Sequence, residues 1–188
     1  DLRGFEDRLT EAGLLLCQLE IPLAVVEYAL KTARHRSVTT VLNPAPAPDA
    51  PLPEGLLAAV DILVPNEVET EALTGVPVKD IADAETAAAV LHDKGCSTVI
   101  ITLGDRGVLV SAAGHCRHLP AFQVSPVDSV AAGDAFCGAL AAALVEGRDL
   151  QAAVRLAAAA GALCTTRRGA QEALPSRSEI EEFLARRG

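Results

Sequence analysis

The segment Ala131-Ala132-Gly133-Asp134 has the clearest chemical potential in the sequence, because it directly precedes a long apolar stretch that predicts a helix. Small residues at a helix start leave backbone N–H groups open at its positive end, which is the geometry of an anion hole. Gly133 lets a ligand approach the backbone closely. The Asp134 carboxylate would repel a neighbouring phosphate unless it accepts a proton from an attacking hydroxyl. The alternative is that Asp134 only stabilises the helix start.

Asn66 and Glu69 form a second candidate site. An Asn at the N-cap with a Glu three residues later stabilises a helix start without any further function. The same two side chains lie one helical turn apart and face the same way, so a phosphate or a hydrated Mg²⁺ could be held between them. The sequence leaves both interpretations open.

Residues 102–107, Thr-Leu-Gly-Asp-Arg-Gly, are a third candidate, because they follow a β-branched run and ligands of α/β sheets bind at strand carboxyl ends. Neither a dinucleotide fingerprint nor a Walker A loop occurs in the sequence. A fourth segment, His115-Cys116-Arg117-His118, invites a zinc interpretation. Strand alternation places Cys116 and His118 on one face and His115 on the other, which argues against it.

The elements that must position these residues follow from the apolar pattern. Short apolar runs alternate with helical patterns, which predicts an α/β fold with a mainly parallel sheet. Strands are expected at residues 14–17, 38–42, 62–64 and 98–103, with an antiparallel hairpin of residues 108–110 and 116–119 around Ala113-Gly114. Helices are expected at residues 1–5, from Pro22, at 66–73, at 83–94 with Asp83 as the cap, at 132–146, at 150–164 and after the capping box Ser176-x-x-Glu179.

The composition excludes several classes of protein. With 188 residues, 50% hydrophobic and 22% charged, the chain has material for a core and is not disordered. A net charge of −9 and 3% aromatic residues argue against nucleic-acid and anionic-membrane partners. Five cysteines without a C-x-x-C pair and no signal-peptide pattern predict reduced thiols and a cytoplasmic location. Because the first residue is Asp1, we expect a piece of a longer chain.

Taken in order, four segments resemble the ribokinase family of phosphofructokinase-B-type sugar kinases. They are Asn43-Pro-Ala-Pro-Ala, Pro65-Asn66-x-x-Glu69, Thr102-Leu-Gly-Asp-Arg-Gly107 and Asp128-x-x-Ala-Ala-Gly-Asp134-Ala-Phe. The resemblance implies a single domain with a three-layer α/β/α fold. Residues 1–188 would be the C-terminal, nucleotide-binding part of that domain. The family's first strands, its Gly-Gly sugar-binding segment and its lid, through which it forms homodimers, are absent.

The implied activity is ATP-dependent phosphorylation of D-ribose at the 5-hydroxyl, with Mg²⁺ accompanying ATP. Another sugar or nucleoside kinase, or a non-catalytic nucleotide-binding module, is the alternative. By resemblance, Asp134 is the catalytic base and touches the sugar together with Glu20, while Ala131, Ala132 and Gly133 form the anion hole. ATP would contact Asn66, Thr102, Leu103, Gly104, Asp105, Arg106, Gly107, Gly133 and Asp134, and Glu69 would contact Mg²⁺ through water.

The family also uses a monovalent cation, usually K⁺, next to the anion hole. The matching positions are the Asp128 carboxylate and the backbone carbonyls of Val130, Cys164, Arg167 and Gly169. A sixth position, often Ser in the family, is Ala173 here.

Overall fold

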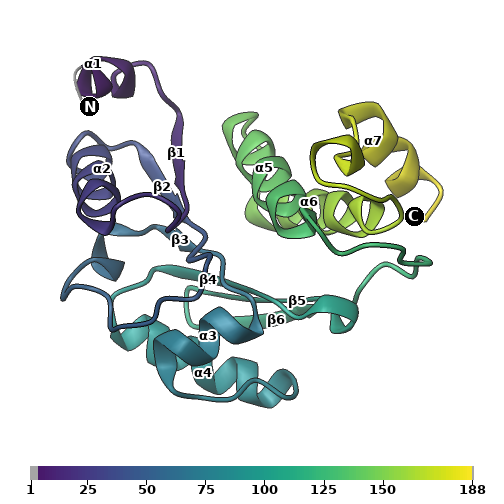
Figure 1. The fold of residues 1–188 in the computed structure, drawn as a ribbon, viewed down its shortest axis with the longest axis horizontal. Coiled ribbons are helices and arrows are strands. Elements are labelled where there is room, and N and C mark those ends of the chain that lie inside the picture. Colours follow the sequence, from purple (N-terminus) through teal and green to yellow (C-terminus); the bar gives the residue numbers. More distant parts are fainter. Residues whose placement is uncertain (1–3, 188) are drawn as a thin grey trace. The chain divides into compact units, whose positions relative to one another are not determined.

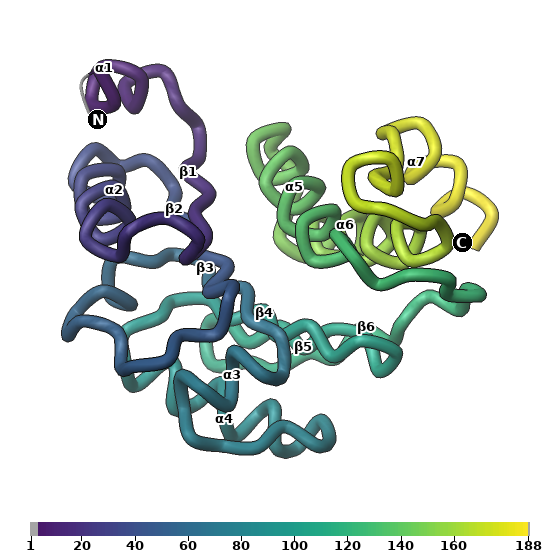
Figure 2. Tube along the Cα trace, in the orientation of Figure 1, coloured from purple at the N-terminus to yellow at the C-terminus, as the bar shows by residue number. Residues whose placement is uncertain are grey.

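A computed structural model describes residues 4–187 (Figure 1). Residues 1–3 of the expected N-terminal helical start lie outside the described part, and helix α1 covers Phe5–Leu9. The chain, traced in Figure 2, divides into two compact units. One comprises residues 4–104 and Val108–His118, and the other comprises Asp105–Gly107 and residues 119–187.

The first unit is built on a six-stranded sheet with strand order β1-β2-β3-β4-β5-β6. The strands are β1 (Leu14–Cys17), β2 (Thr39–Leu42), β3 (Ile62–Leu63), β4 (Thr98–Thr102), β5 (Val108–Ala112) and β6 (His115–Leu119). Strands β1 to β4 pair in parallel, and β5 runs antiparallel to β4. The predicted α/β fold with a mostly parallel sheet is therefore confirmed.

The local sequence explains this sheet. Val99, Ile100 and Ile101 of β4 are fully buried, as expected for a central strand that is covered on both faces. Ala113 and Gly114 between β5 and β6 both have positive φ, 50° and 77°, which matches the two-residue turn that fits the twist of a hairpin. The predicted hairpin is confirmed.

Helices α2 (Leu23–His35), α3 (Glu67–Thr74) and α4 (Ile81–Asp93) belong to the first unit, together with the short 3₁₀ helix η1 (Leu57–Ala59). Helix α2 contacts β1 and β2, whereas α4 contacts β4 and β5. The sequence-based assignment of Asp83 as the cap of α4 is wrong. The cap is Asp80, whose side chain accepts a hydrogen bond from the Asp83 N–H at 2.9 Å, because the helix begins at Ile81, three residues earlier than a cap at Asp83 implies.

The second unit contains α5 (Ala132–Val145), α6 (Leu150–Cys164), the 3₁₀ helix η3 (Gln171–Ala173) and α7 (Arg177–Ala185). The predicted bounds of α6 and the predicted capping box of α7 are confirmed. Helices α5 and α6 pack closely, since a Cβ atom at Gly161 would lie 3.3 Å from the Ala132 carbonyl oxygen. Within residues 4–187, no helix is long and apolar enough to cross a membrane.

Candidate functional site

The turn before α5 gives the candidate anion hole its shape. Ala131 adopts a left-handed conformation (φ 60°, ψ 7°), which costs a non-glycine residue about 1–2 kcal/mol. The Ala132 N–H donates to the Ser129 carbonyl at 3.3 Å, and the next N–H groups have no carbonyl four residues earlier within the helix. A Cβ atom at Gly133 would meet no described atom within 4 Å. The turn thus leaves open space beside Gly133 at the N-terminal end of α5, as an anion site requires.

Asp134 is exposed in the first turn of α5. Its charge acts on the buried thiol of Cys164 at the end of α6. Burial is the main cause of the raised pKa of Cys164, and the negative charges of Asp134 and Asp128 raise that pKa further, against the opposing charge of Arg167. The candidate base Asp134 and two candidate cation residues, Asp128 and Arg167, therefore lie near the thiol of a third, Cys164.

Asp128 connects the segment before α5 with the loop after α6. Its Oδ1 accepts a hydrogen bond from the Val130 N–H at 3.1 Å, and its Oδ2 accepts one from the Gly169 N–H at 3.2 Å. The N–H of Val130, then that of Gly169, lowers the pKa of this carboxyl, and the charge of Arg168 adds to the effect. The Asp128 N–H itself donates to the Thr165 carbonyl at 3.1 Å. The carboxylate is thereby fixed as a charged group.

The other candidate cation residues surround this connection. The Cys164 thiol donates to the Val130 carbonyl with the two heavy atoms 3.6 Å apart, and the Arg167 N–H donates to the Cys164 carbonyl at 3.1 Å. One carboxylate with several carbonyl oxygens is a donor set that suits a hard cation such as K⁺. Ala173 is fully buried and offers no side-chain oxygen.

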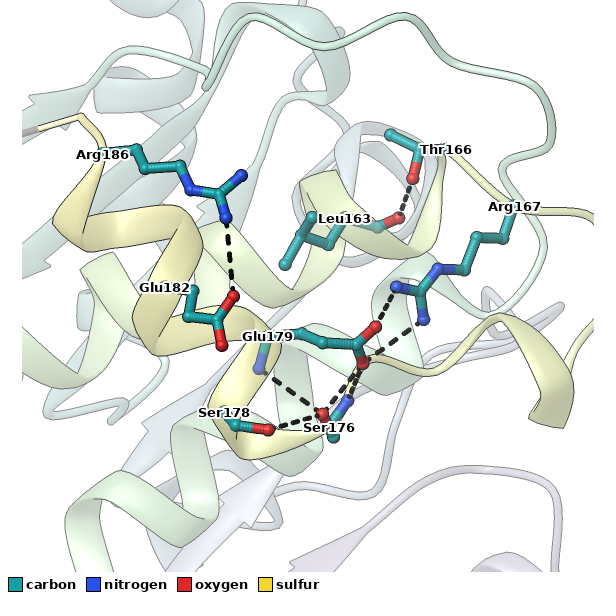
Figure 3. Close-up of polar contacts among 8 residues, drawn as sticks. All are labelled: Leu163, Thr166, Arg167, Ser176, Ser178, Glu179, Glu182 and Arg186. Carbon is teal, nitrogen blue, oxygen red and sulfur yellow. Dashed lines mark hydrogen bonds and ion pairs between the residues drawn. The ribbon is translucent and has the colours of Figure 1, made fainter.

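Arg167 also attaches this loop to α7 (Figure 3). Its guanidinium donates to both carboxylate oxygens of Glu179. Glu179 at the same time accepts hydrogen bonds from the Ser176 N–H at 2.8 Å and the Ser176 hydroxyl at 2.9 Å. The hydrogen bond from Arg167, followed by those from Ser176, lowers the pKa of Glu179 to about 2. One carboxylate therefore caps α7 and anchors the loop.

In the first unit, Asn66 and Glu69 form a complete capping box at the start of α3. The Asn66 Oδ1 accepts from the Glu69 N–H, and the two oxygens of Glu69 accept from the Asn66 N–H and its side-chain amide, all at 2.9 Å. Glu69 is only 4% exposed, and burial raises its pKa while the Asn66 N–H opposes that shift. The predicted cap is confirmed, and the two side chains bind each other directly.

Two residues that the sequence reasoning did not assign to the site extend this group. The Asn43 amide donates to the Val64 carbonyl at 2.8 Å and to the Glu69 carboxylate at 3.4 Å. The Gln18 amide donates to the Asn43 Oδ1 at 3.0 Å. Gln18 follows β1 and Asn43 follows β2, so their positions at strand carboxyl ends were the signal for this polar chain.

Thr102 lies beside Asn66 at the end of β4, where its N–H donates to the Pro65 carbonyl at 2.9 Å. Residues Gly104–Arg106 then form the 3₁₀ helix η2. Gly107 has φ 99°, and a Cβ atom there would lie 2.1 Å from the Leu119 carbonyl oxygen, so only glycine fits. The second glycine of this motif therefore has a structural role of its own.

The structure thus brings most of the candidates together in two groups, one in each unit, while Asp105–Gly107 belong to the second unit. Asn66, Glu69 and Thr102 are contiguous in the first unit, and Asp128 to Asp134 and the loop after α6 are contiguous in the second. Glu20 is exposed just beyond β1 and, within residues 4–187, makes no hydrogen bond or ion pair with the other candidates. In the second unit, Asp134 also lines a cavity of about 260 Å³ between small residues of α5 and α6 and the side chains of Leu174 and Arg177.

Comparison with known proteins adds to this geometry. Residues 6–177 match the pfkB family carbohydrate kinase. Ribokinase of Haemophilus influenzae is 46% identical over 183 residues, covering 97% of this chain and 59% of the relative. Deoxyribokinase of Salmonella typhi is 37% identical over the same proportions. The chain therefore spans about three fifths of the length of these relatives.

Solved structures show the same likeness. Arabidopsis thaliana ribokinase complexed with ribose and ATP superimposes with a TM-score of 0.91 at 32% identity, over 96% of this chain and 58% of that one. Ribokinase of Thermotoga maritima gives a TM-score of 0.87 at 38% identity, over 96% of this chain and 59% of that one. The expected ribokinase-like α/β fold is confirmed.

Proposed function

Because the chain belongs to the pfkB family of carbohydrate kinases, we propose that it is the C-terminal, nucleotide-binding part of a single-domain ribokinase. The complete enzyme transfers the γ-phosphoryl group of ATP to the 5-hydroxyl of D-ribose. The observation that carries the proposal is the junction of the left-handed turn at Ala131 with an exposed Asp134 at the start of α5. It supplies an anion site and a base in adjoining residues.

Asp134 is the catalytic base of this proposal. Its carboxylate accepts the proton of the sugar hydroxyl as the oxygen attacks the γ-phosphorus, and a positioned base of this kind contributes about 10²–10⁴ in rate. Asp134 and Glu20 hold the sugar. Placement on the first turn of a helix fixes the carboxylate relative to the backbone donors beside it, which phosphoryl transfer requires because it depends mainly on positioning.

Ala131, Ala132 and Gly133 stabilise the charge on the transferred group. Their N–H groups lie at the positive end of α5, where donors fixed in advance lower the barrier without reorganising. The left-handed Ala131 is set by the structure around it, including the hydrogen bonds of Asp128. We place the K⁺ ion at Asp128 and the carbonyls of Val130, Cys164, Arg167 and Gly169, and the position of Ala173 contributes no side-chain ligand.

Asn66 and residues 102–107 bind the nucleotide phosphates and ribose. Mg²⁺, when bound with ATP, neutralises charge between the phosphates. Glu69 acts on that ion through water, because its carboxylate is buried and already accepts hydrogen bonds from Asn66 and Asn43. Its direct task is to hold the amide of Asn66 in place.

The second candidate function is phosphorylation of a different sugar or a nucleoside, which the 37% identical deoxyribokinase supports. A non-catalytic nucleotide-binding module is the third. Assays of the complete protein with a panel of pentoses, deoxypentoses, hexoses and nucleosides separate them. We expect D-ribose to give the highest kcat/KM. A higher value for another acceptor would move the assignment to that kinase, and no turnover at all would favour the binding module.

The remaining features of the proposal concern the assembly. The enzyme acts in the cytoplasm as a homodimer that is formed through a lid outside these 188 residues. With a net charge of −9, it takes no nucleic-acid partner. Sedimentation of the complete protein tests the dimer, and a monomer at micromolar concentration would contradict it.

A further inference from the structure

A chain of hydrogen bonds unrelated to the kinase residues connects α4 with the β5–β6 hairpin. The Cys116 thiol donates to the Ser111 hydroxyl, with sulfur and oxygen 3.3 Å apart. The Ser111 hydroxyl lies 2.8 Å from His92 Nε2, and His92 Nδ1 lies 2.7 Å from the Cys96 carbonyl oxygen. Packing of α4 against β5 brings the imidazole to the serine.

The direction of this chain follows from its inner end. A backbone carbonyl only accepts, so His92 Nδ1 carries the hydrogen and Nε2 of the neutral ring is the acceptor. Ser111 therefore donates to His92, which leaves its oxygen lone pairs free to accept the Cys116 proton. The first two hydrogen bonds therefore lead from the thiol to the imidazole, and the third holds the imidazole Nδ1 on the Cys96 carbonyl. The arrangement is that of a nucleophile joined to a base whose other nitrogen is held by a third group.

Burial distinguishes Cys116 from the other thiols. Ser111 is only 4% exposed, whereas Cys116 at the outer end of the chain is exposed, and it is the one exposed cysteine in the described part of the protein. Burial raises the pKa of Cys96 to about 12 and also raises the pKa of Cys17. Among the described cysteines, Cys116 is therefore the thiol that a reagent in solution can reach, and hydrogen bonds connect it to His92.

We propose that Cys116 is an activated thiol whose substrate class is low-molecular-weight disulfides. The thiol proton passes to the Ser111 oxygen as the Ser111 proton passes to His92 Nε2. The sulfur then attacks one sulfur of the disulfide, the S–S bond breaks, and a mixed disulfide forms at Cys116. The departing thiolate takes up the proton that His92 returns through Ser111, so no proton is gained or lost overall. Cys116 thus replaces one of the two thiols of the disulfide. The disulfide itself is the oxidant, and no other oxidant is consumed.

The test is the rate of mixed-disulfide formation with oxidised glutathione at pH 7 in the complete protein. Trypsin releases residues 107–117 as one peptide in which Cys116 is the only cysteine, so mass spectrometry follows this thiol alone. Ser111→Ala removes the oxygen that accepts the thiol proton, so we expect it to slow the reaction about tenfold, and Ser111→Thr, which keeps the hydroxyl, to restore most of it.

A matched control moves the thiol by one residue. The double variant Cys116→Ser with His115→Cys places an exposed thiol in the same peptide but on the opposite face of β6, away from Ser111. It should react as slowly as Ser111→Ala. Equal rates for the unmodified protein and this control, or an unchanged rate in a folded Ser111→Ala protein, would overturn the proposal. Iodoacetamide is applied to the same variants to separate thiol activation from recognition of glutathione. An activated thiol reacts faster with both reagents, whereas recognition of glutathione would accelerate only the reaction with oxidised glutathione.

Discussion

The Oδ2 atom of Asp128 accepts a hydrogen bond from the backbone N–H of Gly169 at 3.2 Å, across 41 residues of sequence. The other oxygen of the same carboxylate accepts from the Val130 N–H, directly before the turn at Ala131. One side chain thus fixes both the loop after α6 and the approach to α5. The shape of the candidate anion hole consequently depends on residues that do not belong to it.

A first prediction concerns the cation. If a cation held by Asp128 and the neighbouring carbonyls fixes the turn before α5, replacing K⁺ by Li⁺ should lower the activity of the complete enzyme. Asp128→Asn should lower activity in K⁺ and remove most of the difference between the ions. The control is Glu182→Gln, an exposed acid of α7 that pairs with Arg186. Activity that is indifferent to the ion would mean that Ala173 marks the loss of the site.

A second prediction concerns pH. The pKa of Glu179 is lowered to about 2 in the folded protein from an ordinary value of about 4.3, so its bonds favour the charged form. Their contribution to stability is fully present above the ordinary value and disappears as pH falls through about 2. The Tm difference between the unmodified protein and Glu179→Gln should be constant above pH 5 and shrink below pH 4. A difference that does not change with pH would contradict this.

A third prediction concerns the polar chain at the strand ends. Asn43→Ala removes a donor to the Val64 carbonyl and to the buried Glu69 carboxylate. Leaving buried acceptors unsatisfied costs about 1–3 kcal/mol, so the free energy of unfolding in urea should fall by that amount. Glu71→Gln, at an exposed position of α3, should change it by less than about 0.5 kcal/mol. Equal effects of the two substitutions would show that the chain does not stabilise the fold.

The elements that the sequence predicted well are those with local signals. The capping boxes at Asn66 and Ser176, the Ala113-Gly114 turn and the bounds of α6 each follow from residues within a few positions of one another. Contacts across long separations were not predictable in this way. The hydrogen bond from Asn43 to Glu69 spans 26 residues and exists only because β2 and β3 pair in parallel register.

The cap of α4 shows a different limit. Both Asp80 and Asp83 are suitable cap residues, and they lie three positions apart. Propensity alone does not choose between them, because a helix that starts at either position has a carboxylate in its first turn. The effect of the Asp134 charge on the pKa of Cys164 was equally hidden, since it depends on how α5 packs on α6.

A fourth prediction concerns the 188 residues in isolation. They carry the proposed nucleotide contacts but, by the proposal, lack the lid and most of the sugar site. Because phosphoryl transfer depends on holding donor and acceptor in line, the isolated chain should bind ADP weakly and phosphorylate no sugar. Calorimetry with ADP and a coupled assay with ribose measure the two properties. Ribose phosphorylation at an ordinary kinase rate would show that the sugar site lies within this chain.

The central claim is that Asp134 is the base of a phosphoryl transfer, and the direct measurement is single-turnover phosphorylation of ribose by the complete enzyme carrying Asp134→Asn. The exposed position tolerates the amide, so the fold, measured by circular dichroism, and ADP affinity should be retained. The rate of the chemical step should fall by about 10²–10⁴. An unchanged rate in the folded, nucleotide-binding variant would contradict the account and leave Asp134 as a residue that only stabilises the start of α5.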